Sequence, residues 1–98
     1  MARELLSQTE LDELAGELTG WDVSAASLAR TYRFGNFVEA FGFMASAALV
    51  AEKMDHHPNW SNVYNSVEVS LNTHDRGGVT ELDAALARAM DSLAGRTG

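Results

Sequence analysis

The chain has 98 residues, with 7 Lys and Arg against 14 Asp and Glu, a formal net charge of −7 and no cysteine. This length fits one domain, so we expect residues 1–98 to share a single core that no disulfide stabilises. The negative charge repels phosphate backbones and anionic lipid, which makes nucleic acid and membrane surfaces poor partners. The apolar stretch from Phe41 to Ala51 is too short to span a bilayer, and no basic segment followed by an apolar one opens the chain. We therefore expect a soluble, cytoplasmic protein.

The first third of the chain predicts a helix followed by two strands. A capping box, Ser7-Gln8-Thr9-Glu10, begins the helix, and Gly20 follows its end. The apolar residues of this helix recur at helical spacing: Leu11, Leu14, Ala15 and Leu18. Trp21–Val23 and Leu28–Phe34 have the composition of strands, and small residues at 24–27 separate them. We interpret the two segments as an antiparallel pair.

The longest predicted helix begins at the capping residue Asn36 and runs to Met54. Its apolar stripe, which we interpret as core or as a subunit interface, consists of Phe37, Phe41, Met44, Ala45, Ala48 and Leu49. Pro58 disfavours helical geometry at the residue before it, His57. The chain must therefore leave the helix at the pair His56-His57, which places both histidines at the helix terminus or in the loop beyond it.

From Val63 to His74 the period of the sequence changes to two, which is typical of strands. Asn65-Ser66 is a candidate hairpin turn, although its composition is weaker than Asn-Gly. The alternation places Glu68, Ser70, Asn72 and His74 on one polar face, so we expect His74 at the polar end of a strand. Gly77-Gly78 ends the sheet.

The last predicted helix begins at Thr80-Glu81-Leu82-Asp83, where Asp83 has the position of a cap partner. Its apolar stripe is Leu82, Ala85, Leu86, Ala89, Met90 and Leu93, and we expect the chain to fray from Gly95. The element order is helix-strand-strand-helix-strand-strand-helix. This order predicts an α+β domain with a four-stranded antiparallel sheet and helices packed on one face.

The three histidines, His56, His57 and His74, lie within nineteen residues and have carboxylates beside them. Histidine is the side chain whose ordinary pKa, about 6.5, lies closest to cellular pH, so the cluster suits proton transfer. A simpler interpretation is that His56 and His57 are C-terminal helix residues favoured by the helix dipole. A metal site is disfavoured, because adjacent histidines point in different directions and no second ligand pair has metal spacing.

Other chemistries lack the residues that they need. The chain has no cysteine nucleophile and no serine in a glycine elbow. Gly77-Gly78 lacks the spacing and the lysine of a phosphate-binding loop. General acid and base chemistry on a small organic molecule remains, for which imidazoles and carboxylates suffice.

These residues resemble the pterin-4a-carbinolamine dehydratase family. The match rests on Glu52-Lys53-Met54-Asp55-His56-His57-Pro58 with Thr73-His74-Asp75 downstream. Further matching positions extend the resemblance over nearly the whole chain: Phe41 to Met44, Trp60, Asn62 to Asn65, Val67, Val69, Leu71, Gly78 and Asp83.

The resemblance implies a hydro-lyase that dehydrates 4a-hydroxytetrahydropterin, the carbinolamine left by aromatic amino-acid hydroxylases, to quinonoid dihydropterin. Such an enzyme takes part in tetrahydrobiopterin recycling and needs no cofactor, because the pterin is its substrate. The family also implies a homodimer or a homotetramer. The alternative is a non-catalytic protein-binding or assembly module on the same fold, since folds are reused for different functions. The complete histidine set favours the enzyme, because such a module has no chemical reason to keep it.

The resemblance also assigns roles to residues. It implies His56 and His74 as the acid and base pair, and His57 as a catalytic residue that orients the substrate. The residues implied to line the pterin site are Asp55, His56, His57, Asn72, Thr73, His74 and Asp75, with Glu52, Pro58 and Asp83 in support. Asn72 stands where the family more often has Ser or Thr.

Overall fold

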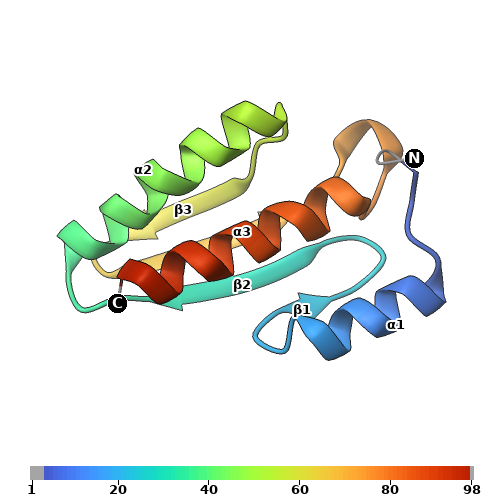
Figure 1. Cartoon of the computed structure of the whole chain (residues 1–98), viewed down its shortest axis with the longest axis horizontal. Coiled ribbons are helices and arrows are strands. Elements are labelled where there is room, and N and C mark those ends of the chain that lie inside the picture. Colours follow the sequence, from blue (N-terminus) through green and yellow to red (C-terminus); the bar gives the residue numbers. More distant parts are fainter. Residues whose placement is uncertain (1–3, 98) are drawn as a thin grey trace.

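Helices and strands alternate along the chain in the predicted order, and the predicted fold class is confirmed (Figure 1). The structure is a computed structural model that describes residues 4–97. Its elements are α1 (Gln8–Glu17), β1 (Asp22–Val23), β2 (Leu28–Arg33), α2 (Phe37–Met54), β3 (Asn59–Val63), β4 (Ser66–Leu71), a short 3-10 helix η1 (His74–Arg76) and α3 (Glu81–Thr97). No helix within this part of the chain is both long and apolar enough to cross a membrane.

The four strands form one antiparallel sheet in the order β1-β2-β4-β3. β4 pairs with β2 on one side and with β3 on the other, so its backbone is hydrogen-bonded along both edges. Two residues, Tyr64 and Asn65, make the turn between β3 and β4, and Tyr64 takes a left-handed conformation with φ 50°. The predicted turn at Asn65-Ser66 is wrong by one residue, because Ser66 already pairs with Val63 and with Arg33.

The helices cover one face of the sheet. Figure 1 shows α2 and α3 side by side across this face, with α1 beside β1. The capping box of α1 forms as predicted: Ser7 Oγ accepts from Glu10 N–H, and Glu10 Oε1 accepts from Ser7 N–H. The buried apolar side chains join helices and sheet in one core, whose largest fully buried members include Phe43, Leu28, Leu71, Leu86 and Met90.

α2 buries a different face from the predicted one. Its buried residues are Ala40, Phe43, Ala47 and Ala51. Members of the predicted stripe point outward instead, with Phe41 56% and Leu49 74% exposed. Met44 is the member of the stripe that packs against the core. The core interpretation is wrong for the exposed members, and the interface interpretation stays a prediction.

α3 buries Leu86 and Met90 of its predicted stripe, but its buried face is shifted toward Ala84 and Ala87. Ala84, Leu86, Ala87 and Met90 are fully buried, whereas Leu82 and Ala85 are only half-buried. Small side chains at Ala84 and Ala87 allow the helix to approach the sheet and α2 closely. The helix also continues through Gly95, beyond the predicted end.

Candidate active site

The histidine pair lies where α2 ends, as predicted from Pro58. Asp55 caps α2 in the left-handed conformation, with φ 52° and ψ 42°. His56 N–H still donates to the carbonyl of Ala51, at 3.0 Å, and the chain then enters β3 at Asn59. This sharp exit turns the two rings into different environments, since His56 is 8% exposed and His57 is exposed.

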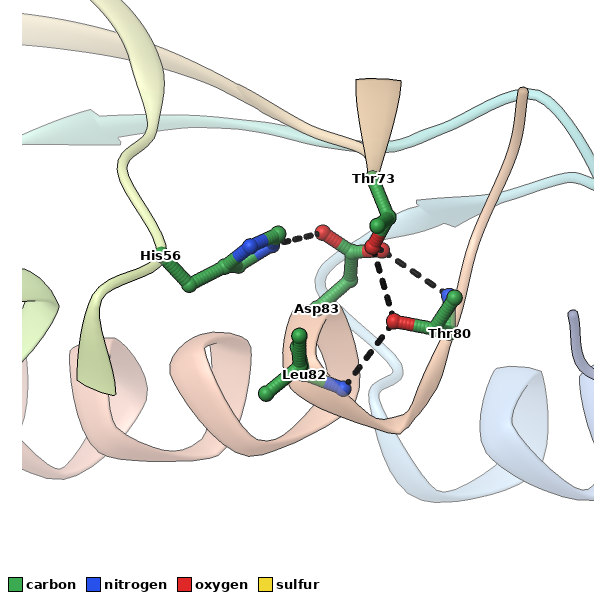
Figure 2. A network of polar contacts seen from close by, with 5 residues as sticks. All are labelled: His56, Thr73, Thr80, Leu82 and Asp83. Carbon is green, nitrogen blue, oxygen red and sulfur yellow. Dashed lines mark hydrogen bonds and ion pairs between the residues drawn. The ribbon is translucent and has the colours of Figure 1, made fainter. Parts of the chain in front are cut away.

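A buried carboxylate, Asp83, holds His56 from the first turn of α3. His56 Nε2 lies 2.6 Å from Asp83 Oδ1. The other carboxylate oxygen, Oδ2, accepts from the Thr73 hydroxyl and from Thr80 N–H, each at 2.9 Å. Figure 2 shows His56 and Thr73 reaching Asp83 from two sides, one from the end of α2 and one from beyond β4. Asp83 therefore joins the two segments that carry the sequence motif.

Asp83 is also the cap partner that its sequence position predicts. Thr80 precedes α3, and its hydroxyl oxygen accepts from Leu82 N–H at 3.2 Å while Asp83 accepts from Thr80 N–H. The arrangement is similar to a capping box, with Asp in place of Glu and with the Thr80 hydroxyl accepting from the second helical residue instead of the third. The capping and supporting interpretations of Asp83 are thus compatible, because each uses a different carboxylate oxygen.

The second histidine of the pair, His57, has a solvent-exposed partner. His57 Nε2 lies 2.9 Å from Glu52 Oε1, one turn back on α2. Both side chains are largely in solvent, with 57% and 79% of their surfaces exposed. Water and salt screen such a pair, so it orients His57 only weakly.

His74 does not lie at the end of a strand, so that prediction is wrong. β4 ends at Leu71, and His74 is an exposed residue that begins η1. The ladder stops because Thr73 turns to bridge Gly78, donating its N–H to the Gly78 carbonyl at 2.8 Å. Gly77 closes this small loop with φ 76°, a value that glycine adopts readily.

The remaining predicted site residues lie in the same two segments. Asp55 and Asp75 are exposed, and Pro58 is half-buried just before β3. Asn72 is half-buried, and its Oδ1 is the one wholly buried side-chain nitrogen or oxygen without a hydrogen-bond partner in the part of the chain that the structure describes. Leaving a buried carbonyl oxygen without a donor costs folding free energy, so this position of Asn72 is unfavourable in the free protein.

The structure thus links His56, Thr73 and Asp83 directly, and it pairs His57 with Glu52 separately. Thr80 is the residue that the sequence analysis did not assign to the site. The T-x-x-D pattern at the start of α3 was its signal, but a pattern cannot show that the cap faces a histidine. Across residues 4–97, no three His, Cys, Asp or Glu side chains are grouped so that they could hold a metal ion.

This site lies on a small α+β domain, where a helix exit and a strand end meet at a buried carboxylate. The chain belongs to the pterin 4 alpha carbinolamine dehydratase family, whose model matches residues 4–93. It is 54% identical to a protein of Rhizobium johnstonii named "Putative pterin-4-alpha-carbinolamine dehydratase", over 98% of this chain and 97% of the relative. It is 53% identical to a Synechococcus protein of the same name, over 91% of this chain and 96% of that one.

Solved structures share the fold. The crystal structure of a transcriptional coactivator/pterin dehydratase from Brucella melitensis superposes with a TM-score of 0.87 at 48% identity, covering 91% of this chain and 97% of that one. A pterin dehydratase-like protein, described as a RuBisCO assembly factor in the alpha-carboxysome, superposes with a TM-score of 0.63 at 25% identity. This second match covers 76% of this chain and 87% of the other.

Proposed function

We propose that the protein dehydrates 4a-hydroxytetrahydropterin to quinonoid dihydropterin and water. The observation that carries the proposal is His56 held on buried Asp83, within a family motif that also keeps His57 and His74. The membership of the chain in the dehydratase family supports the substrate class. The proposal places the enzyme in the cytoplasm, in pterin recycling after an aromatic amino-acid hydroxylase.

The reaction requires two proton movements. The C4a–O bond breaks as the hydroxyl takes up a proton and leaves as water, and N5 loses its proton as the C4a=N5 double bond forms. We assign these two transfers to His56 and His74 as a pair, since imidazole can act as acid and as base near neutral pH. A positioned acid or base contributes about 100-fold to 10,000-fold to such a step.

The surrounding residues would bind and orient the pterin. Residues 55–57, 72, 74 and 75 would line the substrate, with His57 orienting it from its pair with Glu52 and buried Thr73 in support through Asp83. At Asn72, backbone groups rather than the wholly buried side-chain Oδ1 would meet the amide and amino edge of a pterin. The pterin is the substrate, and the proposal includes no further cofactor.

Self-association belongs to the same proposal. The outward face of α2 presents Phe37, Val38, Phe41 and Leu49, each about half or more exposed. A small domain that leaves such a face uncovered gains stability from a second copy. We propose a homodimer or a homotetramer that uses this face.

A coupled assay tests the activity. Purified protein added to an aromatic amino-acid hydroxylase reaction should speed the loss of the 4a-carbinolamine. His56→Ala and His74→Ala should each lower kcat by about 100-fold or more, because each removes one proton transfer. Glu13→Ala, on the exposed face of α1, is the matched control and should keep full activity. A wild-type protein that does not accelerate the reaction, although it is folded by circular dichroism, would contradict the proposal.

The assembly-module alternative has one specific support, the solved relative described as a RuBisCO assembly factor. A stoichiometric protein partner without pterin turnover would favour this alternative. The three histidines favour the enzyme, because binding another protein does not require a buried His–Asp pair.

A further inference from the structure

We propose that His56 is held as the tautomer with its hydrogen on Nε2, so that Nδ1 is the nitrogen offered for proton transfer. Asp83 and Thr73 are the positioning residues that impose this state. The inference rests on the proposed function for the role of Nδ1, whereas the tautomer itself follows from the hydrogen bonds around Asp83.

The donors around Asp83 fix the direction of each bond. Thr80 N–H can only donate, so Asp83 Oδ2 accepts there. Oδ2 also accepts the single Thr73 hydroxyl hydrogen, which leaves Thr73 Oγ1 to accept from the Thr80 hydroxyl, 2.7 Å away. Thr80 Oγ1 in turn accepts from Leu82 N–H. The hydrogens that Leu82, Thr80 and Thr73 donate therefore all run along these contacts in the direction of Asp83. Figure 2 shows the contacts themselves.

The tautomer of His56 follows from this direction. Two donors on Oδ2 favour the ionised carboxylate, and an ionised carboxylate can only accept. The hydrogen between Asp83 Oδ1 and His56 Nε2 therefore belongs to the ring. In the neutral ring, Nδ1 is then the unprotonated nitrogen, which can take a proton and later return it.

The contact of His56 with Asp83 uses one ring nitrogen, Nε2. Nδ1 is the ring nitrogen that this pair does not use. Thr73 differs from the residues that could touch substrate, because it is 2% exposed and its hydroxyl and N–H are both engaged within the protein.

Nitrogen NMR tests the inference on the intact protein. Long-range proton–nitrogen correlation spectra of 15N-labelled protein, at alkaline pH where imidazoles are neutral, distinguish protonated from unprotonated ring nitrogens. His56→Gln assigns the His56 signals by their loss. We expect hydrogen on Nε2 in the wild type, and hydrogen on Nδ1 would overturn the inference. This spectrum does not depend on turnover. A protein without dehydratase activity would contradict the proposed function, and the spectrum would still decide the tautomer.

Asp83→Asn gives the sharper result. The amide oxygen must face Thr80 N–H and the Thr73 hydroxyl, so the NH₂ group faces His56 Nε2, which then accepts. We expect the hydrogen to move to Nδ1 and kcat to fall by about 100-fold or more with KM little changed, as in the wrong tautomer of a His–Asp pair. An unchanged tautomer would overturn the inference.

Thr73 supplies a second pair of variants in case Asp83→Asn does not fold. Thr73→Val removes the donor to Oδ2 while keeping the shape of the side chain, and Thr73→Ser keeps the hydroxyl. We expect Thr73→Val to lower kcat with KM little changed. We expect Thr73→Ser to keep most of the wild-type kcat. Equal activity of the two variants would show that the hydroxyl does not position Asp83, which contradicts this part of the inference.

Discussion

Asp91 is a second carboxylate that gathers donors from distant segments, and it has a structural role. From α3 it accepts from Trp21 Nε1 at 3.0 Å, from Arg30 Nη1 at 2.9 Å and from the Tyr32 hydroxyl. These contacts fasten α3 to β2 and to the start of β1. Burial, reinforced by the hydrogen bond and the charge of Asp91, raises the pKa of Tyr32 well above its usual value.

The raised pKa of Tyr32 predicts how stability changes at alkaline pH. In the unfolded chain a tyrosine titrates near pH 10, whereas folded Tyr32 keeps its proton to higher pH. The stabilising contribution is thus fully present below about pH 10, and it is lost as the pH rises above that value. The free energy of unfolding should fall there by at most about 1.4 kcal/mol per pH unit.

Tyr32→Phe should remove this alkaline fall, measured by urea unfolding between about pH 9 and pH 11.5. The substitution should also lower stability at pH 7, by about 1–3 kcal/mol, because Asp91 loses a donor. Tyr64→Phe is the matched control, since Tyr64 lies 60% exposed at the β3–β4 turn, and this variant should retain the fall. An equally steep decline in Tyr32→Phe would mean that another group governs alkaline unfolding.

At the scale of single residues, the sequence predicted one part of the candidate site well. Pro58 was enough to place His56 and His57 at the end of α2, because the residue before a proline avoids helical geometry. His74 was misplaced, since polar and apolar residues keep alternating through Asn72 and Thr73 although the ladder ends at Leu71. Nothing in the alternation reveals that Thr73 turns back to Gly78, because that bridge depends on a tertiary contact.

At the scale of elements, α2 shows why periodicity predicted the helix but not its orientation. From Phe37 to Ala51 the helix carries one charged residue, Glu39, so apolar residues occupy every side. The large side chains marked one stripe, but the fold buries the stripe of alanines with Phe43 among them. Small residues allow α2 to approach α3 and the sheet, and close packing decides the buried face when hydrophobicity does not.

Two neighbouring alanines test this orientation. Ala47→Leu should lower the free energy of unfolding by about 1–3 kcal/mol, because Ala47 is fully buried and its site has no room for a larger side chain. Ala48→Leu makes the same change on the exposed face and should stay within about 0.5 kcal/mol of wild type. Urea unfolding of dilute protein measures both values. If Ala48→Leu lowered the free energy of unfolding more than Ala47→Leu does, the predicted stripe would lie in the core.

At the scale of the whole molecule, charge and apolar surface act against each other. The net charge of −7 keeps copies of the chain apart in solution. The outward face of α2 lacks charge over most of its length, and Val63 and Tyr64 at the β3–β4 hairpin are also exposed. The proposed association should therefore strengthen as salt screens the repulsion, up to an ionic strength of about 0.5 M.

Leu49→Glu should break this association, because it places a carboxylate within the proposed interface, where Leu49 is now 74% exposed. Sedimentation equilibrium should show an oligomer for the wild type and a monomer for the variant, with an unchanged far-ultraviolet circular dichroism spectrum. Ala15→Glu adds the same charge to an exposed position of α1 and should leave the oligomer intact, which separates a local clash from general repulsion. If both variants dissociate, net charge controls assembly, and if neither does, the copies meet through a surface other than α2. The interface is assigned to α2 if Leu49→Glu dissociates the oligomer and Ala15→Glu does not. A carboxylate buried without a partner in an interface costs far more free energy than one more charge in solvent.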